Sequence, residues 1–120
     1  MKENLLVDLS KGFAVDIIRL YEEIRETKKY TVIVNQLIRC GTSIGANIHE
    51  GNYAASRADF INKFQIALKE CYETEYWLEI MKESDIITVE KYDVLISKCG
   101  KIRKILISSI NTAKDNAESI

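Results

Sequence analysis

The chain has 120 residues, with 17 basic and 18 acidic side chains and a formal net charge of −1. An apolar fraction of 47% excludes a disordered chain. The balanced charge argues against a dedicated nucleic-acid binder, whose affinity depends on neutralising phosphates. The length suits one domain with its own core, and the absence of proline leaves long helices unbroken. We therefore expect a single all-α domain over residues 1–120.

The first predicted helix covers about residues 5–27. The segment before it carries mixed charge, so no signal peptide is expected, and no run of eighteen apolar residues predicts a membrane span. The apolar residues of this predicted helix recur at helical spacing and form one stripe: Leu6, Phe13, Ile17, Leu20, Tyr21 and Ile24.

The second predicted helix covers about residues 31–50. Gly41 and Gly45 lie four residues apart on its apolar side, which indicates close approach of a neighbouring helix. Gly51 is predicted to end the helix in a left-handed cap. The opposite side suits either a solvated surface or a polar contact between helices or subunits, and it carries Gln36, Arg39, Ser43, Asn47 and Glu50.

The third predicted helix covers about residues 57–82. Ser56, with Asp59 three residues later, resembles a capping box. Glu75 projects close to the apolar stripe of this helix, so its carboxylate needs a basic partner from another helix or chain. The stripe itself contains Phe60, Phe64, Ala67, Leu68, Cys71 and Leu78.

The third helix is also apolar on its outer side. A helix with two apolar sides is normally buried on both, and tryptophan is a frequent interface anchor. We therefore predict an oligomer contact formed by Ile66, Glu73, Trp77 and Ile80, next to Glu70 and with Tyr76 and Met81 at its edges.

The fourth predicted helix covers about residues 88–113, with Thr88 as its N-cap, and residues 114–120 are expected to fray. Five basic and two acidic side chains lie between residues 88 and 113. A basic band on this helix could contact nucleic-acid phosphates, or it could be an ordinary solvated surface. The band contains Lys98, Lys101, Arg103 and Lys104.

The residues offer little for catalysis or for a cofactor. His49 is the single histidine, and no glutamate stands three residues before it, so a di-iron bundle is excluded. Cys40, Cys71 and Cys99 include no C-x-x-C pair; they are expected to be buried, reduced thiols of a cytoplasmic protein. We predict no enzyme activity, no cofactor or metal and no small-molecule substrate.

One segment resembles a known family. Residues 43–51 read Ser-Ile-Gly-Ala-Asn-Ile-His-Glu-Gly, which is similar to the Asn-Ile-x-Glu-Gly pattern of the four helix bundle proteins. These are also called intervening-sequence proteins, after reading frames inserted in bacterial 23S ribosomal RNA genes, and the family is known as the S23 ribosomal protein family. The resemblance assigns structural roles to Ser43, Asn47, Glu50 and Gly51. Gly45 and His49 depart from the pattern. Further matches are Gln36, Leu37, Arg39, Ser56, Asp59, Phe60 and the run 67–70, and the run 73–78 resembles one branch of the family.

The resemblance implies an antiparallel up-and-down four-helix bundle that assembles into a homopentameric ring without enzyme activity. Relatives include the accessory protein of diversity-generating retroelements, a basic pentamer that associates with RNA and reverse transcriptase. Three hypotheses follow for this chain. It is a homo-oligomeric binding scaffold, or an RNA-binding accessory protein that uses the basic band, or a monomeric adaptor for a protein partner.

Overall fold

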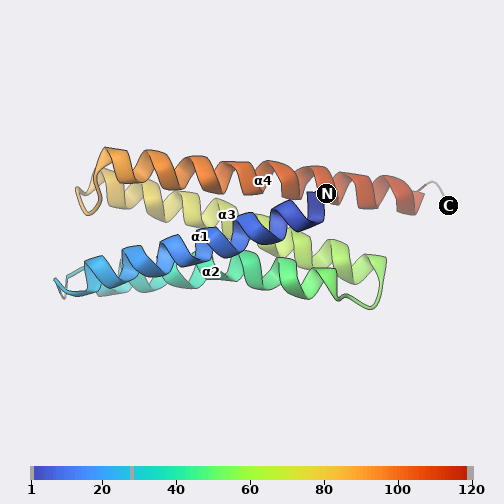
Figure 1. Cartoon of the computed structure of the whole chain (residues 1–120), viewed down its shortest axis with the longest axis horizontal. Helices are drawn as coiled ribbons and strands as arrows, with labels where there is room; N and C mark the ends of the chain where they lie inside the picture. Colours follow the sequence, from blue (N-terminus) through green and yellow to red (C-terminus); the bar gives the residue numbers. More distant parts are fainter. Residues whose placement is uncertain (1, 28, 119–120) are drawn as a thin grey trace.

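In the described part of the chain, four helices follow one another, joined by short connections (Figure 1). The structure, a computed structural model, describes residues 2–27 and 29–118. The helices are α1 (Lys2–Arg25), α2 (Thr31–Asn52), α3 (Arg57–Glu83) and α4 (Val89–Glu118). No strand occurs in the described ranges. In this part of the chain, none of the helices has an apolar stretch long enough to cross a membrane.

The helices form an antiparallel up-and-down bundle that measures 54 × 22 × 20 Å. Each helix packs against the helices before and after it in the chain, and α1 closes the ring of four against α4. Because each turn is short, successive helices must run in opposite directions. The expected fold class is therefore confirmed.

The turns are fixed by local hydrogen bonds. Ser56 accepts a hydrogen bond at its Oγ from the Asp59 backbone N–H at 3.1 Å, and Thr88 accepts one from the Lys91 N–H at 3.1 Å. Both N-caps are thus the residues that the sequence predicts. The turn before α4 contains Asp85 at φ 59°, a left-handed conformation that aspartate tolerates better than most residues.

The end of α2 differs from the prediction. Gly51 was expected to adopt a left-handed cap, but α2 continues through it to Asn52, and none of the described glycines has positive φ. Gly51 is instead buried against α3, where a Cβ atom would lie 2.7 Å from Cδ1 of Phe64. The prediction of a left-handed cap is wrong; the glycine is needed because two helices approach closely.

The end of α4 also differs. The helix continues past residue 113 to Glu118, so the described part of the expected frayed segment is helical. Residues 119–120 lie outside the described range.

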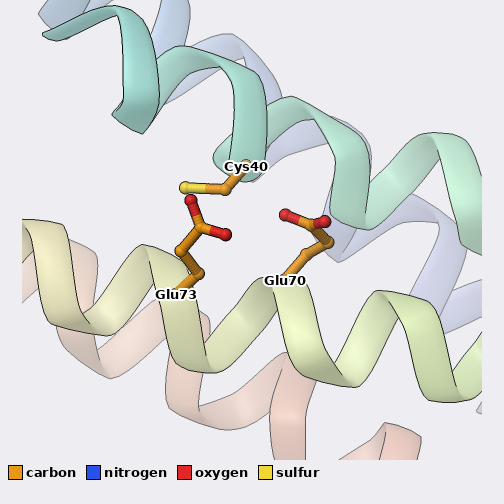
Figure 2. Close-up of side chains that lie close together, drawn as sticks. All are labelled: Cys40, Glu70 and Glu73. Atoms are coloured by element: carbon orange, nitrogen blue, oxygen red, sulfur yellow. The ribbon is translucent and has the colours of Figure 1, made fainter. Parts of the chain in front are cut away.

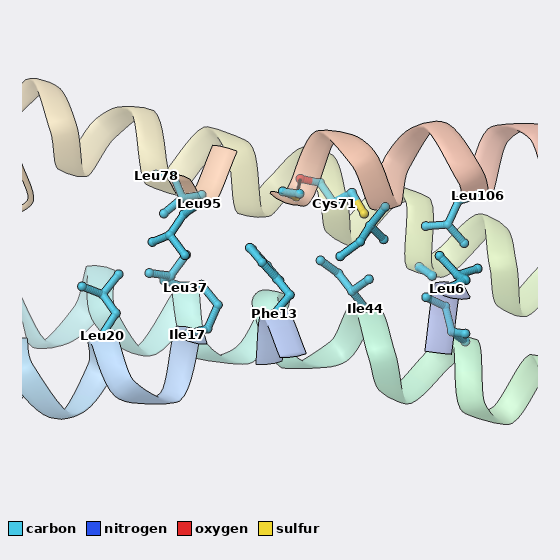
Figure 3. Close-up of a cluster of buried hydrophobic side chains, with 14 of the residues drawn as sticks. Leu6, Phe13, Ile17, Leu20, Leu37, Ile44, Cys71, Leu78, Leu95 and Leu106 are labelled. Atoms are coloured by element: carbon cyan, nitrogen blue, oxygen red, sulfur yellow. Dashed lines mark hydrogen bonds between the residues drawn. The ribbon is translucent and has the colours of Figure 1, made fainter. Parts of the chain in front are cut away.

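The core runs along the bundle and includes residues of all four described helices; Figure 3 shows part of it. Gly41 and Gly45 bring α2 close to α1, since Cβ atoms there would meet Ile17 at 3.0 Å and Ser10 at 3.4 Å. Met81, expected at the edge of the outer side of α3, is completely buried in this core. The buried residues from the two predicted stripes are Leu6, Phe13, Ile17, Leu20, Ile24, Phe64, Ala67, Cys71 and Leu78, and α2 and α4 add Leu37, Ile44, Leu95 and Leu106.

Candidate functional site

The most elaborate polar cluster lies between α2 and α3, at the outer edge of the core. Arg39 of α2 forms ion pairs with Glu70, at 3.6 Å, and with Glu73 of α3. Arg39 also donates a hydrogen bond to Oε1 of Gln36 at 3.3 Å, and the Nε1–H of Trp77 donates one to Glu73 at 3.2 Å. The two helices are thus joined by a network of charged and polar side chains along one side of the bundle.

Cys40 lies directly inside this network (Figure 2). Its thiol is completely buried; the sulfur points toward the carboxylate of Glu73 and lies within 4.8 Å of an oxygen of each glutamate. It donates a weak hydrogen bond to the Leu37 carbonyl at 3.5 Å. Burial in the core, reinforced by the nearby carboxylates, raises the pKa of Cys40 to about 11, although a hydrogen bond from Thr74 and the charge of Arg39 oppose this shift. The free thiol is therefore protonated at neutral pH.

Glu70 is the member of the network with the weakest hydrogen bonding. Its Oε2 is buried and accepts no hydrogen bond within the described part of the chain. Burial raises the pKa of Glu70, Arg39 lowers it and Glu73 raises it. Because the pKa is raised, the effect of desolvation outweighs that of the ion pair with Arg39. The ionised form of Glu70 therefore destabilises the folded chain.

The desolvation of Glu70 predicts that the free energy of unfolding depends on pH. A carboxyl whose pKa is higher in the folded chain than in the unfolded one binds protons better when folded, so its contribution to stability falls as pH rises above about 4.5. Glu70→Gln is neutral at every pH and escapes this loss. We expect the unfolding free energy of the variant, relative to wild type, to increase between pH 4 and pH 7 in urea titrations.

The matched control is Glu79→Gln, which removes an exposed carboxylate from the same helix. The increase in unfolding free energy relative to wild type between pH 4 and pH 7 should occur in Glu70→Gln and not in Glu79→Gln. A difference from wild type that stays constant, or that falls with rising pH, would contradict the assignment of a desolvated carboxylate at position 70.

The predicted contact residues lie along the outer edge of this cluster. Trp77 is half-buried, packs against the core, and meets the ring of Tyr76 edge-on at 5.1 Å. Ile66 and Ile80 are also half-buried. We call the surface formed by Gln36, Arg39, Ser43 and Asn47 of α2 with Ile66, Glu70, Glu73, Trp77 and Ile80 of α3 the α2–α3 face.

The four residues of the family pattern all lie on α2. Ser43 donates to the Arg39 carbonyl at 2.6 Å, and the Asn47 amide donates to the Ser43 carbonyl at 2.9 Å. Both side chains thus bond within their own helix, one turn back, and not to the following loop. Glu50 is exposed and Gly51 is buried.

The basic band of α4 is divided between two environments. Lys98 forms an ion pair with Asp16 of α1 at 2.7 Å, and Arg103 pairs with Glu75 of α3 at 3.0 Å. The hydrogen bond to Glu75 raises the pKa of Arg103, and this pair supplies the partner that the sequence requires for Glu75. Lys101 and Lys104 are exposed. Two of the four cations are therefore already engaged by carboxylates of their own chain.

Sequence reasoning placed Glu70 and Glu73 on the outer side of α3 but treated Cys40 only as a small buried residue. It did not predict that the side chains of Cys40, Glu70 and Glu73 lie close together. The available signal was positional: Cys40 follows Arg39 directly, so it lies where the polar side of α2 meets the apolar side.

Comparison with known proteins agrees with this architecture. The model of the 23S rRNA-intervening sequence protein family matches residues 2–108. A crystal structure of a protein of unknown function, from the S23 ribosomal protein family of Bacteroides thetaiotaomicron, is 50% identical to the chain and superposes with a TM-score of 0.90. The match covers 92% of this chain and 99% of that one. No curated protein matches the chain. The chain belongs to the 23S rRNA-intervening sequence protein family.

Proposed function

We propose that this chain is a non-enzymatic subunit that self-associates through the α2–α3 face and that the resulting ring serves as a binding scaffold. The observation that carries the proposal is Trp77, which is only half-buried although it is the single tryptophan of the chain. Solvent contact of a large aromatic group, next to Ile66 and Ile80, is typical of an interface anchor.

The charges of this face favour burial in a contact. Glu73 is paired with Arg39 and bonded to Trp77 before any partner arrives. A charge that is already neutralised costs less to desolvate than a free one, and the bond to Glu73 holds the indole in one orientation. The face is therefore organised in the isolated subunit, which reduces the entropy lost on association.

The basic band of α4 supports an RNA-binding role less well. Asp16 and Glu75 compete with phosphates for Lys98 and Arg103, and releasing either cation would leave a partly buried carboxylate unpaired. Lys101 and Lys104 alone offer a small electrostatic contribution. For this reason we base the proposal on the α2–α3 face.

Sedimentation velocity tests the proposal. We expect wild type to form a discrete assembly of about 69 kDa, five times the 13.8 kDa of one chain. Ile80→Ser should weaken each contact, and Trp77→Ala should do so by at least about 2 kcal/mol, as for other interface anchors. Both variants should shift the mass distribution toward monomer at micromolar concentrations.

Val94→Ser is the control, since Val94 is an exposed apolar residue on α4, away from the α2–α3 face. It should leave the assembly intact. Circular dichroism establishes that each variant is folded. A monomeric wild type would refute self-association, and an assembly that persists in both Ile80→Ser and Trp77→Ala would refute the assignment of this face.

A further inference from the structure

Three metal-binding groups converge beneath the α2–α3 face. The thiol of Cys40 and one carboxylate oxygen each of Glu70 and Glu73 all lie within 4.8 Å of one another. They come from two helices, and Figure 2 shows both carboxylates turned toward α2, where the sulfur lies. Cys40 is completely buried and the two glutamates are half-buried, so the site is shielded by the bundle on its inner side.

The hydrogen bonding of Glu70 gives a second, independent observation. Its buried Oε2 has no hydrogen-bond donor among the described residues, and the nearest cationic atom, Nη1 of Arg39, stays 3.6 Å away. A buried carboxylate oxygen without a donor is unusual and costly. A cation that approaches Oε2 of Glu70 more closely than the Arg39 guanidinium does would stabilise this carboxylate.

We infer that Cys40, Glu70 and Glu73 form a binding site for a thiophilic divalent transition-metal ion, with zinc as the ion that fits best. One sulfur and two carboxylate ligands suit zinc, whereas magnesium and calcium take oxygen ligands. Cys40 would bind as the thiolate and release its proton to solvent. Three protein ligands leave a fourth position for water.

The geometry requires only a small adjustment. Zinc–ligand bonds of about 2.0–2.3 Å place tetrahedral ligand atoms about 3.3–3.8 Å apart, so the present separations of up to 4.8 Å must close by about 1 Å. Cys40 is fixed in the core, but each glutamate side chain has three rotatable bonds. Rotation of the two carboxylates can therefore close the site without moving either helix.

Arg39 is the competitor for this site. Its guanidinium pairs with both carboxylates, so a metal ion must displace it. In the isolated subunit, displacement is feasible because half of the Arg39 side chain surface is exposed to solvent, and the side chain can rotate outward. The metal-site hypothesis therefore predicts that removal of Arg39 strengthens metal binding, because the carboxylates lose the cation that neutralises them.

A cobalt(II) titration of the purified full-length chain tests the inference, because cobalt(II) replaces zinc and is coloured. We expect a near-ultraviolet thiolate-to-cobalt absorption band that zinc abolishes. In Arg39→Gln the band should appear at cobalt concentrations at least about tenfold lower, while Glu70→Gln and Glu73→Gln should weaken binding by more than about 100-fold, since even outer-sphere partners of metals are worth about 10–100-fold. Absence of the band from both wild type and Arg39→Gln would overturn the inference.

Cysteine variants identify the thiol. Cys40→Ser should abolish the band, and Cys99→Ala, which removes another buried thiol, should retain it. A band that persists in Cys40→Ser or in both glutamine variants would exclude this site. If Cys40→Ser does not fold, the glutamine variants decide the question. The inference stands apart from self-association, because Ile80→Ser keeps all three ligands and should bind cobalt(II) as a dissociated subunit.

Discussion

Replacing Phe13 by alanine is expected to lower the free energy of unfolding by about 3–5 kcal/mol. Phe13 is 1% exposed and lies in the middle of the bundle, where its ring extends from α1 toward α3 and α4 (Figure 3). Alanine removes the ring from a place that all the surrounding helices help to enclose, so the cavity cannot collapse easily. For a domain with a total stability of about 5–15 kcal/mol, this is a large fraction.

Urea denaturation followed by circular dichroism measures the loss, at one fixed protein concentration because assembly adds to apparent stability. Val15→Ala is the control, two residues further along the same helix and 44% exposed. It should change stability by less than about 0.5 kcal/mol. Similar losses in the two variants would show that Phe13 does not have the central role in packing described for it.

The positions of the helices and most of the core could be predicted from the sequence. Apolar residues at a period of 3.6 identify the buried side of a helix without knowledge of its neighbours, and N-caps such as Ser56 and Thr88 depend on bonds within four residues. These features are local. Knowledge of the chain near Phe13 or Leu78 was therefore enough to place both in the core.

The features that could not be predicted depend on how two helices meet. Met81 was assigned to the edge of the outer side of α3, yet it is buried, because the rotation of a helix about its axis decides which flank of its stripe a neighbour covers. The cluster of Cys40, Glu70 and Glu73 likewise requires the register of α2 against α3. No periodicity within one helix contains that register.

Gly51 illustrates the same limit. A glycine near the end of a helix most often adopts a left-handed cap, and this prior led to the wrong prediction. The residue that requires glycine here is Phe64, thirteen positions later on α3. The glycine of the Asn-Ile-x-Glu-Gly pattern is therefore explained by close packing of α2 against α3 and not by backbone conformation.

Gly51→Val is accordingly expected to lower the free energy of unfolding by about 3 kcal/mol, at the upper end of the usual cost of overpacking. The new Cβ would lie 2.7 Å and 2.8 Å from two ring carbons of Phe64. That ring cannot move aside, since it is completely buried and its centroid is 4.1 Å from that of Phe60. Gly12→Val is the matched control: a Cβ there meets nothing within 4 Å, so stability should stay within about 0.5 kcal/mol of wild type.

A double-mutant cycle separates this clash from a general intolerance of valine near the end of α2. Phe64→Leu removes the ring atoms that the new side chain would meet, so Gly51→Val should cost less in the Phe64→Leu background than in wild type, by at least about 1 kcal/mol. Urea denaturation of the four proteins at one concentration gives the coupling energy. Equal costs in the two backgrounds would mean that Phe64 does not impose the glycine. A favourable coupling would show that the contact between α2 and α3, which also brings Cys40 to Glu70 and Glu73, is the constraint that this glycine serves.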